Sequence, residues 1–146
     1  MRERIVNADI TLIPYFPNEA VTLAWYQEPE LCRQVDNIDQ PYSLERLRAM
    51  YTYLSTHGEC YYIFYRGRPV GDVSLQTNGE IAIVLCKDYQ NRHIGRRCIE
   101  EMLRLAKEKG YAQAKATIYS FNTQSQKAFC KAGFRKVEEE LYVFDL

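Results

Sequence analysis

Apolar residues recur along this chain with two periods, one typical of strands and one typical of helices. Short apolar runs rich in β-branched and aromatic residues are predicted as strands, at residues 8–14, 60–65, 70–76, 80–86, 114–118, 135–140 and 141–144. Segments with apolar residues three and four positions apart are predicted as helices, at 19–26, 44–56, 94–109 and 123–132. Asn18, Ser43 and Asn122 stand where helix N-caps are expected, and residues 27–42 are predicted as loop.

The order of these elements predicts one mixed sheet. Strands joined by short turns, such as the Asn-Gly turn at 78–79, must be antiparallel. The strand–helix–strand connection through 94–109 makes one pair parallel. We therefore expect a single domain over residues 1–146 of the α/β class, with a mixed α+β sheet of six to seven mostly antiparallel strands and helices on both faces. The closing strands lie at an edge, which favours pairing into a homodimer.

Composition excludes several classes of protein. Five widely spaced cysteines without a Cys-x-x-Cys motif, and only two histidines, argue against a disulfide framework and against a metal site. The longest apolar run, 81–86, is far too short to cross a membrane, and the charged N-terminus lacks the apolar core of a signal peptide. The sequence therefore predicts a cytoplasmic protein with no metal and no membrane partner.

The charges balance overall but are unevenly placed. Residues 1–86 contain 7 Arg, no Lys and 11 acids, whereas 87–146 contain 12 basic residues and 8 acids. The basic part suits a phosphorylated ligand and the acidic part suits a cation such as an amine, although a chance distribution over the surface explains the same counts. Nucleic-acid binding is not expected, because Glu100, Glu101 and Glu108 interrupt the basic residues.

A buried strand runs through a polar loop into a helix between residues 81 and 109. This arrangement directs backbone N–H groups and the positive end of a helix dipole at one place, where a phosphate or pyrophosphate can bind. The loop has one glycine, Gly95, and no Gly-Lys-Ser/Thr sequence, which excludes a Rossmann or P-loop motif.

Two motifs here resemble those of the GNAT N-acetyltransferases. The loop QNRHIG with Arg96 resembles the acyl-CoA loop of that family, and NTQSQKAFCKAGF at 122–134 resembles its second motif. The two lie in the expected order and context, and the predicted elements resemble the GNAT fold across nearly the whole chain. The resemblance implies an acetyl-CoA-dependent enzyme.

The same resemblance implies the residues that hold acetyl-CoA. Backbone groups of Ile83 and Leu85 would pair with the pantetheine arm in a splay between strands 80–86 and 114–118, and Asn122 would bond the pantetheine. Lys127 and Lys131 would meet the phosphates or the adenosine, although both also fit a solvated helix face. The pyrophosphate would be held by the backbone N–H groups of the loop residues Gln90, Asn91, Arg92, His93, Ile94, Gly95 and Arg96.

Two positions depart from the family pattern. His93 stands where a glycine is usual. A histidine can serve there if the backbone is nearly helical, with its imidazole as a further donor to a phosphate, but we expect only a tolerated substitution with a slightly looser grip. Phe129, expected at the cofactor, stands where many members have a tyrosine that protonates the leaving thiolate. Either Tyr119 or Cys130 supplies that proton, or the thiolate leaves unaided, since a thiol pKa of about 8.5 makes it a fair leaving group.

The implied chemistry is direct attack of a neutral amine on an acetyl thioester. The amine must first lose a proton, and Glu80 is the first candidate base, with Asp72 the second. A backbone N–H near Leu85 would stabilise the oxyanion. Aromatic and acidic residues of the early helices and closing strands are candidates for the acceptor site: Trp25, Tyr26, Tyr42, Tyr51, Tyr53, Tyr142, Glu28, Glu30, Asp36 and Asp39.

The sequence thus predicts an N-acetyltransferase acting on a protein N-terminus, a lysine or a small cationic amine. The alternative is a non-catalytic acyl-CoA-binding sensor or regulatory module, which Phe129 and His93 keep open.

Overall fold

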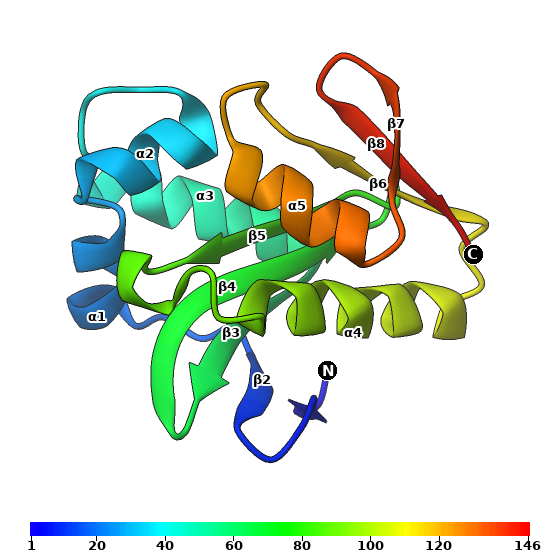
Figure 1. The fold of residues 1–146 in the computed structure, drawn as a ribbon. Helices are drawn as coiled ribbons and strands as arrows, with labels where there is room; N and C mark the ends of the chain where they lie inside the picture. Colours follow the sequence, from blue (N-terminus) through cyan, green and yellow to red (C-terminus); the bar gives the residue numbers. More distant parts are fainter.

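The computed structural model describes residues 1–146 and contains two sheets that diverge from one another (Figure 1). The larger sheet has the order β1 (Arg4–Ile5), β2 (Ile10–Pro14), β3 (Gly58–Tyr65), β4 (Arg68–Gln76) and β5 (Ile81–Leu85), all antiparallel. The smaller sheet has the order β6 (Gln113–Thr117), β8 (Leu141–Asp145) and β7 (Arg135–Glu138), also antiparallel. A single parallel bridge between Glu80 and Lys115 joins the two sheets. Because β5 and β6 are not paired beyond it, a cleft opens between them.

Helices cover both faces of the larger sheet (Figure 1). The helices α1 (Glu19–Trp25), α2 (Pro29–Asp36) and α3 (Leu44–Thr56) enclose a small core on one face, built largely of tyrosines. On the other face α4 (Ile94–Glu108) and α5 (Thr123–Lys131) cover the main core, and the short 3-10 helix η1 (Lys87–Tyr89) precedes α4. No helix is both long enough and apolar enough to cross a bilayer.

The predicted fold class is confirmed, with differences in detail. The sheet predicted as one is divided into five and three strands. Residues 27–42 were predicted as loop but contain α2, which begins with Pro29 and is capped by the Glu28 carboxylate, 2.7 Å from the Leu31 N–H. Ser43 caps α3 as predicted, whereas the Asn18 side chain makes no cap at α1. β7 is exposed along its length, and the homodimer stays a prediction.

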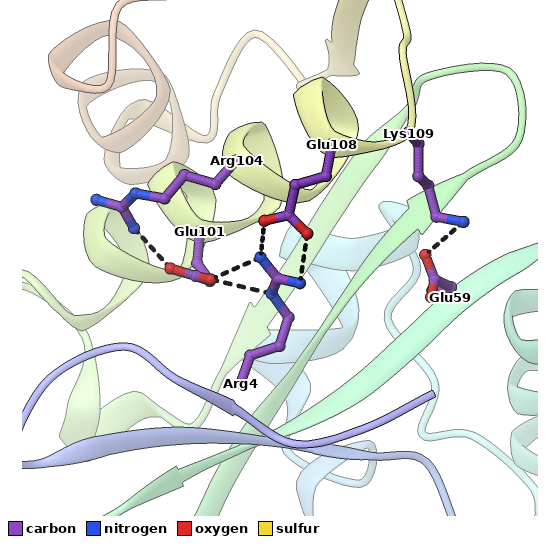
Figure 2. A network of polar contacts seen from close by, with 6 residues as sticks. All are labelled: Arg4, Glu59, Glu101, Arg104, Glu108 and Lys109. Carbon is purple, nitrogen blue, oxygen red and sulfur yellow. Dashed lines mark hydrogen bonds and ion pairs between the residues drawn. The ribbon is translucent and has the colours of Figure 1, made fainter.

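An ion-pair network attaches the N-terminal strand to α4 (Figure 2). The Arg4 guanidinium lies 2.9 Å from Glu101 and 2.8 Å from Glu108, and Glu101 also pairs with Arg104 at 2.6 Å. Glu101 is almost fully buried, so its charge depends on these partners. The network thus joins β1 to the second half of α4.

Candidate active site

The cleft between the sheets runs along the free edge of β5. Backbone groups of Glu80 and Cys86 bond β4, since the Gln76 N–H lies 2.8 Å from the Glu80 carbonyl and the Cys86 N–H lies 2.9 Å from the Val70 carbonyl. Backbone direction alternates along a strand, so the N–H and C=O groups of Ile83 and Leu85 face the cleft. The cleft is lined by Gln34, Val35, Ile81, Ala82, Ile83, Val84, Leu85, Gln90, Gly95, Thr117, Ile118, Tyr119, Asn122, Gln124, Ser125, Ala128 and Phe129.

The loop before α4 forms a backbone anion site. Asn91 and His93 both have a left-handed backbone, with φ of 59° and 65°, and alternation of left- and right-handed residues turns successive N–H groups to one side. The first N–H groups of α4 add to this site, because no side chain caps the helix and its first turn has no acid. The expectation of a nearly helical His93 is wrong: the chain reverses into α4 there, in a conformation that favours glycine.

A basic cavity continues the cleft beyond this loop. It shares Leu85, Gly95, Gln124 and Ala128 with the cleft. Its remaining lining residues are mostly polar or positively charged: Asn91, His93, Arg96, Lys127 and Lys131. Of the predicted loop residues, Arg92 instead directs its guanidinium over Tyr65 and Tyr89, with its central carbon 5.3 and 5.4 Å from the ring centroids.

Several loop residues act by position and not by side-chain chemistry. Ile94 is buried in the main core and offers only its backbone to the loop. Gly95 lies where α4 begins beside β5, and a Cβ atom added there would lie 3.4 Å from Leu85 Cδ1, an ordinary van der Waals contact. The Gln90 side chain crosses the end of the cleft and donates to the Leu85 carbonyl at 2.9 Å and to Gln34 Oε1 at 3.1 Å.

The α5 side of the cleft contains the second motif. The Asn122 carboxamide oxygen accepts from the Ser125 N–H at 3.3 Å and also lines the cleft, so the N-cap and the cleft position coexist. Phe129 is buried and lines the cleft. Its ring packs edge-on against that of Phe134, with the ring centroids 5.0 Å apart. Tyr119 lines the cleft as well, whereas Cys130 is exposed and does not.

An acidic pocket lies on the opposite face of β5. Asp72 on β4 forms its floor, pairs in register with Val84, and accepts hydrogen bonds from the hydroxyls of Tyr26 at 2.7 Å and Tyr51 at 2.8 Å. Burial raises the pKa of Asp72 from 3.8 to about 6, although the hydrogen bonds from the two tyrosine hydroxyls lower this pKa. The pocket and the cleft share Val35, Ala82 and Val84, so the two spaces meet across β5.

A known protein family matches most of the chain that forms these features. Residues 9–135 match the family model described as acetyltransferase (GNAT) domain. The chain belongs to the GNAT acetyltransferase family. No curated protein sequence matches it.

Solved structures show the same GNAT fold at low sequence identity. A domain from Methanocaldococcus jannaschii superposes with a TM-score of 0.83 at 24% identity, over 96% of this chain and 100% of that one. A Salmonella typhimurium acetyl transferase that modifies the N-terminal serine of ribosomal protein L7/L12 has a TM-score of 0.77 at 14% identity, over 99% of each chain. The aminoglycoside acetyltransferase AAC(6')-Ib in complex with coenzyme A has a TM-score of 0.77 at 13% identity, over 93% of this chain and 94% of that one.

Within this GNAT domain, the predicted acceptor residues divide into two groups. Tyr26, Tyr42 and Asp36 line the acidic pocket, and Tyr51 contacts its floor through Asp72. The others have structural roles or lie elsewhere. Trp25 packs edge-on against Tyr62, Tyr53 stacks on His57, Tyr142 is in the main core, Glu28 caps α2, Glu30 pairs with Lys87 and Asp39 pairs with Arg33.

The structure separates the two candidate bases. Glu80 lies at the closed end of β5, in the bridge to Lys115, and lines neither the cleft nor the acidic pocket. Its catalytic role stays a prediction, and Asp72 is the better placed carboxylate. Sequence reasoning missed Gln34 and Val35 of the cleft because it read α2 as loop; Pro29 after an acidic N-cap was the signal that would have found that helix.

Proposed function

We propose that this GNAT protein transfers the acetyl group of acetyl-CoA to a primary amine. One observation carries the proposal: the cleft and the acidic pocket lie on the two faces of β5 and meet at Val35, Ala82 and Val84. A thioester in the cleft and an amine in the pocket would therefore approach each other at the edge of one strand.

The residues around the cleft fit acetyl-CoA, which supplies an activated acetyl thioester. The N–H groups before and within the first turn of α4 would hold the pyrophosphate, with Lys127 and Lys131 nearby for further phosphate charge. The backbone groups of Ile83 and the N–H of Leu85 face the cleft and would hold the pantetheine arm as an added strand, whereas the Leu85 carbonyl already accepts from Gln90. The Leu85 N–H, at the end of the strand, is the candidate donor to the oxyanion.

Asp72 would accept the proton that the amine loses before attack. With a pKa raised to about 6 by burial, its carboxyl is ionised at neutral pH and is more basic than an exposed aspartate. An alkylammonium has a pKa of about 10.4, so the amine is mostly protonated at neutral pH and a base must take up its proton before attack. Phe129 has no proton to give the departing thiolate, and Tyr119 is the predicted proton donor that lines the same cleft.

The acceptor would be a protein N-terminus, a lysine or a small cationic amine. Two GNAT neighbours support an amine acceptor, one acting on the N-terminal serine of a ribosomal protein and the other an aminoglycoside acetyltransferase. The aromatic and acidic lining of the pocket supports a cation. A non-catalytic acyl-CoA-binding module is the alternative, and Phe129 in place of a proton donor is the observation in its favour.

Release of free thiol from acetyl-CoA tests the proposal. The purified protein is incubated with acetyl-CoA and a panel of alkylamines, diamines and short peptides, and its thermal stability is measured with and without acetyl-CoA. We expect acetyl-CoA to raise the melting temperature and at least one amine to raise the rate of thiol release. Stabilisation by acetyl-CoA without any acceptor-dependent thiol release would refute the enzyme and support the binding module.

A further inference from the structure

The mouth of the acidic pocket contains a cation supplied by the protein itself. Three charged side chains line this pocket: Asp72 at the floor, and Asp36 with Arg46 at the mouth. Arg46 lies in the first turn of α3, where its backbone N–H donates to Ser43 Oγ at 3.1 Å. Its side chain therefore extends from a capped helix start, and its placement at the mouth follows from that local structure.

The Arg46 guanidinium occupies a complete cation site. It lies 3.0 Å from the Asp36 carboxylate, and its central carbon lies 4.6 Å from the centroid of the Tyr42 ring. The Tyr42 hydroxyl donates to Asp36 and holds that carboxylate in place. A carboxylate beside an aromatic face is the usual protein site for an ammonium or guanidinium group. The Arg46 side chain is 49% exposed and that of Asp36 is 34% exposed, so solvent and ligands reach this ion pair.

The number of charges in the pocket sets the charge of the ligand that fits it. Two carboxylates and one guanidinium leave one net negative charge, which a single ammonium group neutralises. A second ammonium group on the ligand would have to displace Arg46 from Asp36 and Tyr42. That exchange replaces one cation by another at the same site, so the second charge brings no net attraction.

We infer that Arg46 is a specificity residue that denies an acceptor any gain in affinity from a second positive charge near the reacting group. The inference rests on the proposed function for the identity of the ligand as an acceptor, but the charge selection itself concerns binding. Removal of the Arg46 charge would leave two unneutralised carboxylates, and the pocket would then favour a diamine over a monoamine of equal length. Salt would weaken that preference, because the mouth is open to solvent.

Equilibrium binding of butylamine and putrescine, measured by calorimetry without acetyl-CoA, tests this inference. In the wild type we expect the two dissociation constants to be similar. Arg46→Met keeps an unbranched, helix-compatible stem without the charge, and should favour putrescine by roughly fivefold to tenfold at low salt and by less at high salt. Arg46→Lys keeps the charge and should leave the wild-type ratio unchanged. Asp36→Asn should weaken the binding of both amines, and the double variant Asp36→Asn/Arg46→Met should return toward the wild-type ratio.

An unchanged ratio in Arg46→Met would overturn the inference, as would a change of equal size in Arg46→Lys, which would indicate shape and not charge. Thermal unfolding of each variant confirms that it is folded. The ratio of kcat/KM for the same two amines is measured in parallel. A shift in the ratio of dissociation constants without any acetyl transfer would contradict the proposed function and support the charge selection. Acetyl transfer with an unshifted ratio would support the proposed function and contradict the charge selection.

Discussion

Asp72→Asn should make the protein more stable and less active at the same time. The substitution keeps the shape of the side chain but removes a charge that is buried beneath Tyr26 and Tyr51. Burial raises the pKa of Asp72 from 3.8 to about 6, which corresponds to about 3 kcal/mol of unfavourable free energy in the ionised folded state. An asparagine forms a weaker hydrogen bond with one tyrosine, which costs about 1 kcal/mol of stability. The variant should therefore be about 2 kcal/mol more stable above the pKa of Asp72.

The sign of the pH dependence follows from the same shift. The folded protein binds a proton at Asp72 more tightly than the unfolded chain, so the contribution of this group to stability is fully present below 3.8 and is lost as the pH rises through about 6. The difference in unfolding free energy between variant and wild type should therefore grow between about pH 4 and pH 6 and stay constant above.

Urea denaturation of both proteins across this pH range measures the difference, and thiol release measures the activity. We expect kcat/KM to fall at least about a hundredfold in Asp72→Asn, because a general base is lost. The wild type should lose activity below about pH 6 as Asp72 becomes protonated. Glu80→Gln removes the other candidate base, a carboxylate that lines neither the cleft nor the acidic pocket, and its thiol release is measured alongside. A difference in unfolding free energy that does not change with pH would refute the claim that burial raises the pKa of Asp72. An active Asp72→Asn enzyme would make Glu80 the candidate base again.

Three further substitutions test the cleft. His93→Gly should raise the unfolding free energy by up to about 1 kcal/mol, because His93 has a left-handed backbone; a less stable variant in urea would contradict the strain. Lys131→Gln should weaken acetyl-CoA binding in calorimetry by roughly fivefold at low salt and less at high salt. Lys136→Gln, on the exposed strand β7, should leave acetyl-CoA binding unchanged. An equal loss of affinity in the Lys131 and Lys136 variants would exclude a specific contact between Lys131 and a phosphate. Phe129→Tyr should raise kcat a few-fold below the thiol pKa of about 8.5, and an unchanged rate would show that a hydroxyl there does not reach the sulfur.

Some features of the acetyl-CoA site could be predicted because they depend on neighbours in the chain. Residues 81–109 form strand, loop and helix in the predicted order, and the N–H groups of the loop converge because the backbone turns into α4 there. The motif at 122–134 likewise forms a capped helix whose face lines the cleft. His93 was the exception within this stretch: its residue type does not reveal the sign of φ, which the reversal of the chain imposes.

The acidic pocket depended on contacts between distant segments. Asp72 belongs to a strand that sequence reasoning recognised, but its buried position arises because Tyr26, which follows α1, and Tyr51 of α3 pack over β4. These tyrosines lie 46 and 21 residues away in the sequence, and no local pattern indicates that their hydroxyls meet at one carboxylate. Sequence reasoning therefore ranked Glu80 above Asp72, because both are acids on strands and burial was not visible.

The sequence by itself determined the GNAT fold class and the strand–loop–helix order of residues 81–109, since strand and helix periodicity and backbone direction are properties of short segments. Only the tertiary structure decided which carboxylates line the acidic pocket, that Arg46 lies at its mouth, and that α2 contributes to the lining of the cleft. Burial and charge pairing are properties of surfaces that meet only after folding, and they assign the chemistry of this site to particular side chains.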